Sequence, residues 1–345
     1  MRISIKYRVL QVVCPLIFFS ISACDEHATV TITDAPAHQI CELEENLAPI
    51  GEPFSFAIAD DGDFVLTDFK TVFLYSADGR QIKQIGNPGR AKFEYLNPGC
   101  VKIHESTIYV WSANSLKFIT YTMSGEPIAE YQYGSSLRDF LPDGKKIYIY
   151  TSGNADQHVI DIYDLTEKKV VESMTRTSPE HRALLNVWAS APMFIMGDTF
   201  YYSLKDALNV YCHDSKTNGQ REYADVNSDV FSVEKLRDEE SVLSDKNKRT
   251  DYLWGNSMTL ILFTDSNGDL LLLTADGKIS RNGGNYDYSD RFYTLYNVAK
   301  DSIIAEYSHA SIKTLSLFSS NSDGLYFLKL SDDETQPHTL QKLIL

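Results

Sequence analysis

Short acidic turns are the first places in this chain where side chains could bind a metal ion. Residues 265–269 (Asp-Ser-Asn-Gly-Asp) offer oxygen atoms at alternate positions, as a calcium-binding loop does. They lack the distal glutamate that completes such a loop, and they lie between two strand-like runs. Because Asp and Asn before Gly also suit the positive φ angles of a hairpin, we predict a turn and no metal site. The same prediction applies to residues 60–63, 143–144 and 276–277.

The histidines are too widely spaced to form a recognisable catalytic or metal-binding motif. No HxH or HExxH pair occurs, and the chain has no GxSxG elbow, no Walker loop and no dinucleotide-binding fingerprint. A fold that gathers distant residues around one axis could still bring histidines together. The sequence itself predicts no catalytic residue, no metal ligand and no cofactor. The histidines considered are His104, His158, His181, His213 and His309.

Cys24 has the neighbours that a lipid-modified cysteine requires. A basic start precedes an uncharged apolar segment, residues 9–21, that is too short to cross a bilayer as a helix. This leader resembles a bacterial lipoprotein signal, in which a large apolar residue and two small residues (here Ile-Ser-Ala) precede the cysteine that receives the diacylglyceryl group. Cys14 lacks the pattern because the bulky Val13 precedes it. We expect cleavage before Cys24 and lipidation of its thiol, with an ordinary secretory peptide as the alternative.

The two residues after Cys24 bear on where the protein is displayed. Asp25 and Glu26 resemble the acidic surface-export signal of Bacteroidetes lipoproteins, whereas an aspartate at this position resembles an inner-membrane retention signal in enterobacteria. We expect a protein that is lipid-anchored in the outer membrane and exposed at the cell surface. The periplasmic face is the alternative.

The charge of the chain limits its partners. The formal net charge is −15 over 345 residues. All charged residues of the leader are basic, so the mature chain has a more negative net charge. This charge repels nucleic acid and anionic lipid. We therefore expect no nucleic-acid partner, and we attribute membrane attachment to acyl chains on Cys24.

Three further cysteines lie in the mature chain. Their odd number allows at most one disulfide, and their spacing matches neither CxxC nor a zinc-ligand set. We predict that Cys41, Cys100 and Cys212 are buried or structural.

Most of the chain reads as short strands separated by turns. A strand rich in β-branched and aromatic residues recurs directly after a turn of Asp, Gly, Asn or Ser. In the two best copies, residues 54–85 and 100–131, one strand precedes it and two follow it. A repeat of about 40 residues with four strands is typical of a propeller blade. The recurring strands are residues 64–67, 108–111, 147–150, 200–203, 270–273 and 303–306.

This pattern predicts an all-β fold, a six-bladed β-propeller of four-stranded antiparallel blades over residues 45–345. Blades must pack radially because one blade cannot bury both of its faces. We expect strands from both ends to close the ring, with residues 339–345 and 40–47 as the candidates. A seven-bladed ring is the alternative if the widest gap between repeats contains a degenerate blade.

The segments outside the repeats are a leader, a tether and an insertion. Residues 1–23 form the signal peptide, and residues 24–44 form the lipidated N-terminus and tether. An insertion falls near residues 225–256, and its charge-dense part, residues 229–248, has apolar residues at near-helical spacing. We predict a helical or mobile excursion on one rim. A tolerated surface loop is the simpler interpretation, and a functional loop is the alternative.

Aromatic residues are frequent in the predicted strands. We expect most of them to fill the space between blades, where sheets twist apart. The Gly-rich segment 282–288 is different because it is polar and carries two tyrosines, which could hold a sugar or peptide by stacking. The strand aromatics are Tyr109, Trp111, Tyr148, Tyr150, Tyr201 and Tyr202.

Residues 86–98 carry a family resemblance. The sequence Gly-Asn-Pro-Gly-Arg-Ala-Lys-Phe-Glu-Tyr-Leu-Asn-Pro resembles the glycine-rich interblade loop of NHL-type propellers, G-x-G-P-G-E-F-x-x-P, although Arg90-Ala91-Lys92 stands where that pattern is shorter. With the lipoprotein signal, the whole chain resembles the six-bladed β-propeller lipoproteins of Bacteroidetes, described as TolB-like. The resemblance implies fold and location, and it assigns no catalytic residue.

The resulting hypothesis is a membrane-anchored, extracytoplasmic lipoprotein that is not an enzyme. Loops on one face would bind a protein, peptide or glycan of a cell-envelope system. The alternative is a propeller hydrolase or lyase with a metal-dependent site in the axial channel, because six-bladed rings also host lactonases and related enzymes. Convergent carboxylates and histidine at the channel mouth would indicate chemistry, whereas turns and aromatics would indicate recognition.

Overall fold

The described part of the chain begins near the end of the predicted tether. The computed structural model describes residues 34, 37–151, 153, 158–185, 190–217, 219–282, 285–309, 317–331 and 336–345. The leader, Cys24, Asp25 and Glu26 lie outside these residues, so their cleavage, lipidation and sorting stay predictions. Within the described residues, no helix is both long and apolar enough to cross a membrane.

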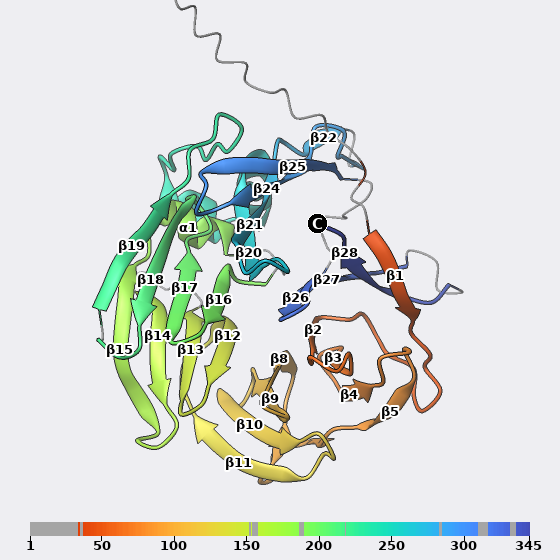
Figure 1. Ribbon diagram of the computed structural model, residues 1–345. Helices are drawn as coiled ribbons and strands as arrows, with labels where there is room; N and C mark the ends of the chain where they lie inside the picture. The colour runs from red at the N-terminus through yellow and green to blue at the C-terminus, as the bar shows by residue number, and fades with distance from the viewer. Residues whose placement is uncertain are drawn as a thin grey trace, which may run out of the picture. The chain divides into compact units, whose positions relative to one another are not determined.

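Six four-stranded antiparallel sheets surround a central axis as the blades of a propeller (Figure 1). Blade 1 contains β2 (Ser55–Ile58), β3 (Phe64–Thr67), β4 (Val72–Tyr75) and β5 (Gln81–Gln84). Blade 2 contains β8 (Pro98–His104), β9 (Thr107–Ser112), β10 (Lys117–Thr122) and β11 (Pro127–Gln132). Blade 3 contains β12 (Leu137–Asp143), β13 (Lys146–Thr151), β14 (His158–Asp164) and β15 (Lys169–Arg176).

The other half of the ring is less regular. Blade 4 contains β16 (Met193–Met196), β17 (Thr199–Ser203), β18 (Asn209–Asp214) and β19 (Gly219–Asp225). Blade 5 contains β20 (Met258–Thr264), β21 (Leu270–Asp276), β24 (Phe292–Asn297) and β25 (Ser302–Ser308), with a hairpin of β22 (Ser280–Asn282) and β23 (Asn285–Asp287) between β21 and β24. Blade 6 contains β26 (Leu317–Asn321), β27 (Gly324–Lys329), β28 (Thr339–Leu343) and β1 (Ala37–Glu42).

Strands from the two ends of the described chain close the ring, as predicted. β1 pairs antiparallel with β28, from Ala37 opposite Leu343 to Glu42 opposite Thr339. The closing strand begins three residues before the expected segment 40–47, so blade 6 takes in part of the segment assigned to the tether. Gly79 permits this docking, because a Cβ atom there would lie 2.0 Å from the carbonyl oxygen of Glu42.

The core lies between the blades rather than within a single layer. In the described residues, each pair of neighbouring blades shares a hydrophobic cluster of its own. Between blades 3 and 4, for example, the Tyr148 and Phe200 rings stack with centroids 4.1 Å apart. This confirms the predicted role of most strand aromatics. Cys41, Cys100 and Cys212 are free thiols and are buried, as predicted.

The sixth predicted repeat was wrong. Residues 303–306 belong to β25, the outer strand of blade 5, because the β22–β23 hairpin lengthens that blade and displaces the count. The second strand of blade 6 is β27, which follows the turn at residues 321–324. The described sheets form six blades, so the seven-bladed alternative is also wrong.

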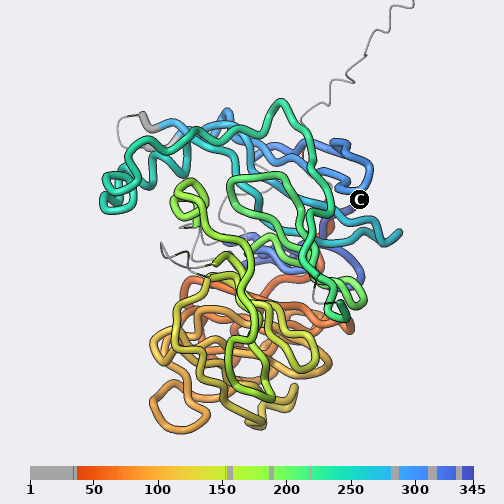
Figure 2. Tube along the Cα trace, turned by 90° about the vertical axis from the view of Figure 1, so that its left-hand side faces the viewer, coloured from red at the N-terminus to blue at the C-terminus, as the bar shows by residue number. Residues whose placement is uncertain are grey.

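The second half of the insertion is helical, and it lies where the chain crosses from blade 4 to blade 5. Its helices are α2 (Glu239–Ser244) and α3 (Lys246–Gly255), and they contact α1 (Pro179–Leu184), which lies in the crossover from blade 3 to blade 4. The backbone N–H of Leu236 donates to Glu180 at 2.8 Å, which links the insertion to α1. Figure 2 shows this helical segment standing out on one face of the ring.

The other connections differ in length and direction. β6 (Asn87–Pro88) and β7 (Glu94–Tyr95) form a short parallel pair within residues 86–98, which connect blade 1 to blade 2. Tyr95 is buried there, and its hydroxyl donates to the carbonyl oxygen of Ile85 at 3.0 Å. In each crossover the chain passes from the outer strand of one blade to the inner strand of the next.

Candidate functional site

A cavity opens at one end of the central channel, beneath α3. Its volume is about 560 Å³, within the range of small-molecule sites. We call it the α3 mouth. Its lining comes from the beginnings of the inner strands, the β3–β4 turn, β9 and α3, and comprises Phe54, Ser55, Phe56, Phe69, Gly99, Cys100, Lys102, Trp111, Ala113, Leu137, Arg138, Asp139, Ser190, Lys246, Arg249, Thr250, Leu253, Trp254, Leu317 and Phe318.

Aromatic side chains form much of the wall of the α3 mouth. Phe56, Trp111 and Phe318 are buried, and Phe69 is half-buried. Phe69 has a φ angle of 69°, which is strained for a bulky residue. Asp68 holds this turn, because its Oδ1 accepts from the backbone N–H groups of Lys70 and Thr71 at 3.0 and 2.8 Å. Backbone strain at a cavity wall is typical of functional sites.

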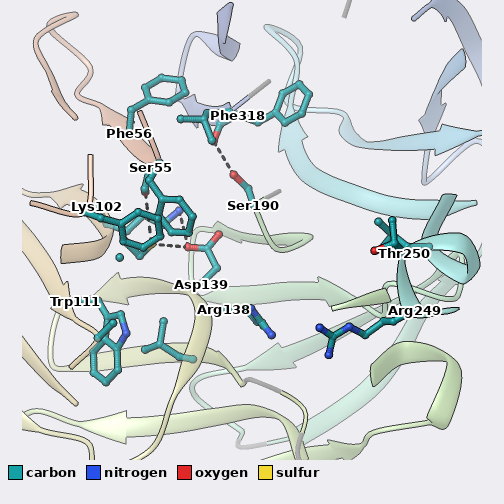
Figure 3. Close-up of a pocket in the computed structure, with 18 of the residues that line it drawn as sticks. Ser55, Phe56, Lys102, Trp111, Arg138, Asp139, Ser190, Arg249, Thr250 and Phe318 are labelled. Carbon is teal, nitrogen blue, oxygen red and sulfur yellow. Dashed lines mark hydrogen bonds and ion pairs between the residues drawn. The ribbon is translucent and has the colours of Figure 1, made fainter. Parts of the chain in front are cut away.

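A buried ion pair lies at the inner end of the α3 mouth. Lys102 Nζ is 2.9 Å from Asp139 Oδ1 (Figure 3). Burial alone lowers the pKa of Lys102, but the Asp139 carboxylate outweighs it and raises the pKa above its ordinary value. The Cys100 thiol donates to Asp139 Oδ1 at 3.1 Å, and the Ala191 N–H donates to Asp139 Oδ2 at 3.0 Å. Both oxygens of Asp139 therefore have partners, which indicates a structural role.

The environment of Cys100 favours its protonated, unreactive thiol form. Burial raises the pKa of its thiol, and the negative charge of Asp139 raises the pKa further. Only the thiolate is reactive, so a thiol that stays protonated at neutral pH is chemically inert.

Arg138, Arg249 and Lys246 give the α3 mouth a positive charge. Figure 3 shows the guanidinium groups of Arg138 on β12 and Arg249 on α3 pointing toward each other. Arg138 is exposed to the mouth, but the ring around it still removes part of its solvation; this desolvation, and then the charge of Arg249, lower the pKa of Arg138. Asp139 is the single carboxylate in the described lining.

A second cavity, of about 550 Å³, opens at the opposite end of the channel. It shares Lys102, Asp139, Ser190 and Phe318 with the α3 mouth, so these residues form the waist of the channel. Hairpin turns surround this second opening, including residues 265–266 and 320–322. No residue of α3 lines it.

The predicted turns are turns. Asp265 accepts from the backbone N–H groups of Asn267 and Asp269, both at 2.9 Å, which is the geometry of a side-chain-closed hairpin. At residues 276–277, Asp276 is the last residue of β21 and is fully buried, and the chain turns at Gly277, where φ is 74°. Desolvation raises the pKa of Asp276, in spite of hydrogen bonds and the charge of Arg291 that lower it.

The structure distributes the five histidines over separate elements. His104 lies at the second opening, where Nε2 accepts from the Gly144 N–H at 3.2 Å. His181 is buried in α1, and His213 is buried in β18. His158 begins β14, and the His309 ring stacks on Tyr288 with centroids 4.5 Å apart. Among the described residues, no three His, Cys, Asp or Glu side chains lie close enough to hold one metal ion.

The Gly-rich segment 282–288 lies away from the α3 mouth. Its backbone takes part in the β22–β23 hairpin, and Gly283 and Gly284 lie outside the described residues. Tyr288 stacks on His309 beside a separate shallow cavity. The proposed stacking of a sugar or peptide on this segment stays a prediction.

Sequence reasoning missed the residues that define the α3 mouth. Arg138 and Arg249 lie 111 positions apart in the sequence and line one cavity because α3 lies over the channel. Trp111 was predicted to be a packing residue; it is 3% exposed, yet it also lines the cavity. The insertion was the feature of the sequence that could have indicated this site, because it carries Arg249, Leu253 and Trp254 within two helical turns.

Comparison with known proteins supports the fold. The family DUF5128, described as a 6-bladed beta-propeller, matches residues 48–259. No curated protein shows significant sequence similarity to the chain. A presumed exported protein of Bacteroides fragilis NCTC 9343 is 11% identical, with a TM-score of 0.64, over 92% of this chain and 98% of its own. A member of the DUF4221 family from Bacteroides vulgatus ATCC 8482 is 11% identical, with a TM-score of 0.59, over 91% and 97% of the two chains.

Proposed function

Because the chain belongs to the DUF5128 family of six-bladed β-propellers, a fold that does not by itself fix an activity, we propose that it is a non-enzymatic binding protein whose ligand lies in the α3 mouth. The observation that supports this proposal is the lining of the mouth. Aromatic rings and cationic groups converge there, whereas Asp139 is already used by Lys102, Cys100 and Ala191. The ligand would be a protein, peptide or glycan of the cell envelope.

Substitution within α3 tests this site. Thr250 lines the mouth, so Thr250→Trp should fill it, whereas Lys248→Trp on the same helix changes an exposed position outside the lining. Detergent-extracted full-length protein would be tested on peptide and glycan arrays. We expect binding by the wild type and by Lys248→Trp, and a loss with Thr250→Trp. Binding that survives Thr250→Trp would place the ligand elsewhere.

The proposed location is the outer membrane, with Cys24 as the lipidated anchor. The leader, the residues around Cys24 and the exported character presumed for the Bacteroides fragilis structure support it. Cys24→Ala should leave the precursor uncut or release the protein from the membrane fraction. Normal membrane retention of this variant would refute lipidation, and protease treatment of intact cells separates surface display from the periplasmic face.

Metal analysis addresses the alternative of a propeller hydrolase or lyase. Purified protein would be assayed for calcium and zinc after exchange into metal-free buffer. A stoichiometric ion would favour the enzyme and contradict the proposed function. A protein that binds its ligand without turnover and without a stoichiometric ion would support the proposed function.

A further inference from the structure

The charges of the α3 mouth differ in sign from those of the molecule. The chain carries a formal net charge of −15, yet the described lining holds four cationic side chains and one carboxylate. Lys102 is neutralised by Asp139. Arg249 and Lys246 form no ion pair within the described residues, and Arg249 has one weak contact, 3.5 Å to the carbonyl oxygen of Leu243.

Two guanidinium groups that face each other repel, and the repulsion is strongest where solvent is partly excluded. An anion bound by Arg249 and facing Arg138 would offset this repulsion and would give Arg249 a charge-assisted hydrogen-bond partner. Arginine suits a carboxylate in particular, because its planar fork can donate to both oxygens. The orientation of Arg138 and Arg249 toward a common space therefore points to a bound acidic group (Figure 3).

The remaining lining indicates what the acidic group is attached to. Phe56, Leu253 and Phe318 are buried apolar residues of the wall. Of the polar side chains, Ser190 Oγ already donates to the Phe318 carbonyl oxygen at 2.7 Å, and Thr250 Oγ1 donates to that of Lys246 at 2.8 Å. These two hydroxyls are therefore already used, and the cationic groups supply most of the other side-chain donors of the described lining. An apolar group fits this wall better than a polyhydroxylated sugar does.

We propose that the α3 mouth binds the carboxylate of an apolar organic acid, with the carboxylate between Arg249 and Arg138 and the apolar group against the aromatic wall. This inference rests on the proposed function and adds the chemical class of the ligand. A peptide C-terminus with an apolar last residue and a free small acid are two sources of the same chemistry.

Matched acid and amide probes test the proposal. Calorimetry would measure binding of N-acetyltryptophan and N-acetyltryptophanamide, which differ only in the carboxylate. The wild type should bind the acid about tenfold more tightly than the amide, as expected for one charge-assisted hydrogen bond. Arg249→Gln should abolish this preference, and Lys248→Gln, which removes one charge from the same helix outside the mouth, should retain it. Arg249→Lys should restore part of it.

The outcomes separate the two proposals. Equal binding of acid and amide that Thr250→Trp abolishes would reject carboxylate selectivity and leave the proposed function intact. Failure of both probes to bind would reject the apolar acid, and the array experiment would then decide the proposed function. Glucuronate binding as tightly as N-acetyltryptophan would overturn the apolar part. Tighter binding of acetyl-Ala-Ala-Trp than of N-acetyltryptophan would identify a peptide as the source. Melting curves would confirm that Arg249→Gln is folded.

Discussion

Lys205 has the most unusual electrostatic environment among the described lysines. Its side chain is 2% exposed, and Nζ donates to the carbonyl oxygens of Ser190 and Thr259 at 2.8 and 2.9 Å. Burial lowers the pKa of Lys205 to about 7, although the charge of Asp139 opposes this effect. Ser190 also lines the channel, so this ammonium group lies directly behind the wall of the α3 mouth.

We predict that Lys205 makes the stability of the protein depend on pH. The unfolded chain keeps the ordinary lysine pKa of 10.5, so between pH 7 and that value it binds more protons than the folded protein. Stability should therefore rise with pH across this window. From about pH 7 to about pH 9, the wild type should gain about 2 kcal/mol of unfolding free energy relative to Lys205→Met. Urea unfolding at both pH values measures this difference.

The control for Lys205 is an exposed lysine. Lys145 lies in the turn between β12 and β13, so Lys145→Met should leave the pH dependence of unfolding as it is in the wild type. A difference between wild type and Lys205→Met that stays constant over the window would contradict a lowered pKa. The comparison is made as a difference because burial raises the pKa of tyrosines such as Tyr75 and Tyr121 above the ordinary value, so they add a pH dependence of their own near the upper end of the window.

At the scale of elements, the sequence predicted the strands of the early blades well and the helices only approximately. Every strand expected within residues 54–85 and 100–131 is present, because Gly and Asp turns punctuate β-branched runs there. In the insertion, residues 229–238 are not helical, although their apolar residues have helical spacing. The helices begin only after residue 238 because Asp238 and Asp245 act as N-caps. Each side chain accepts a hydrogen bond from a backbone N–H group in the first turn of one short helix.

We predict that Asp245 stabilises α3 and thereby the α3 mouth. Its Oδ1 accepts from the N–H groups of Asn247 and Lys248 at 2.8 and 3.2 Å. Loss of such a cap costs about 1 kcal/mol, so Asp245→Ala should speed local hydrogen exchange in residues 246–255 about fivefold. Asp251→Ala, at an exposed position of the same helix, should have little effect. Equal protection in both variants would show that tertiary packing alone holds α3.

At the scale of the whole molecule, the repeated four-strand units determine the fold, whereas the cavity forms only when the units are arranged as a ring. Each blade has a local signature, so the ring could be predicted from turn spacing even though the sixth repeat was misplaced. The residues of the α3 mouth come from blades 1, 2, 3 and 6, from the crossover that holds Ser190 and from α3, so the groups that form the mouth lie far apart in sequence. These residues come together because the blades are arranged radially around one axis. A local sequence pattern does not show which residues will face that axis at the same level.

Ring closure depends on β28, whose two buried leucines face different neighbours. Leu340 is fully buried in the cluster shared with blade 1, and Leu343 is 2% exposed in the cluster shared with blade 5. Ile344, next in sequence, is 51% exposed and offers a matched control. One strand thus joins both sides of the closing blade and also carries β1 at its edge.

We predict that Leu340→Ala and Leu343→Ala each destabilise the protein by about 3 kcal/mol, since a truncated core leucine loses apolar burial and leaves a cavity. Ile344→Ala should change the unfolding free energy by less than about 0.5 kcal/mol. Deletion of residues 340–345 should lower the melting temperature further than either leucine variant, because it exposes the edge of β27 and removes the partner of β1. Urea unfolding and melting curves measure these effects. An unchanged melting curve for the deletion would mean that blade 6 does not depend on the C-terminal strand for closure.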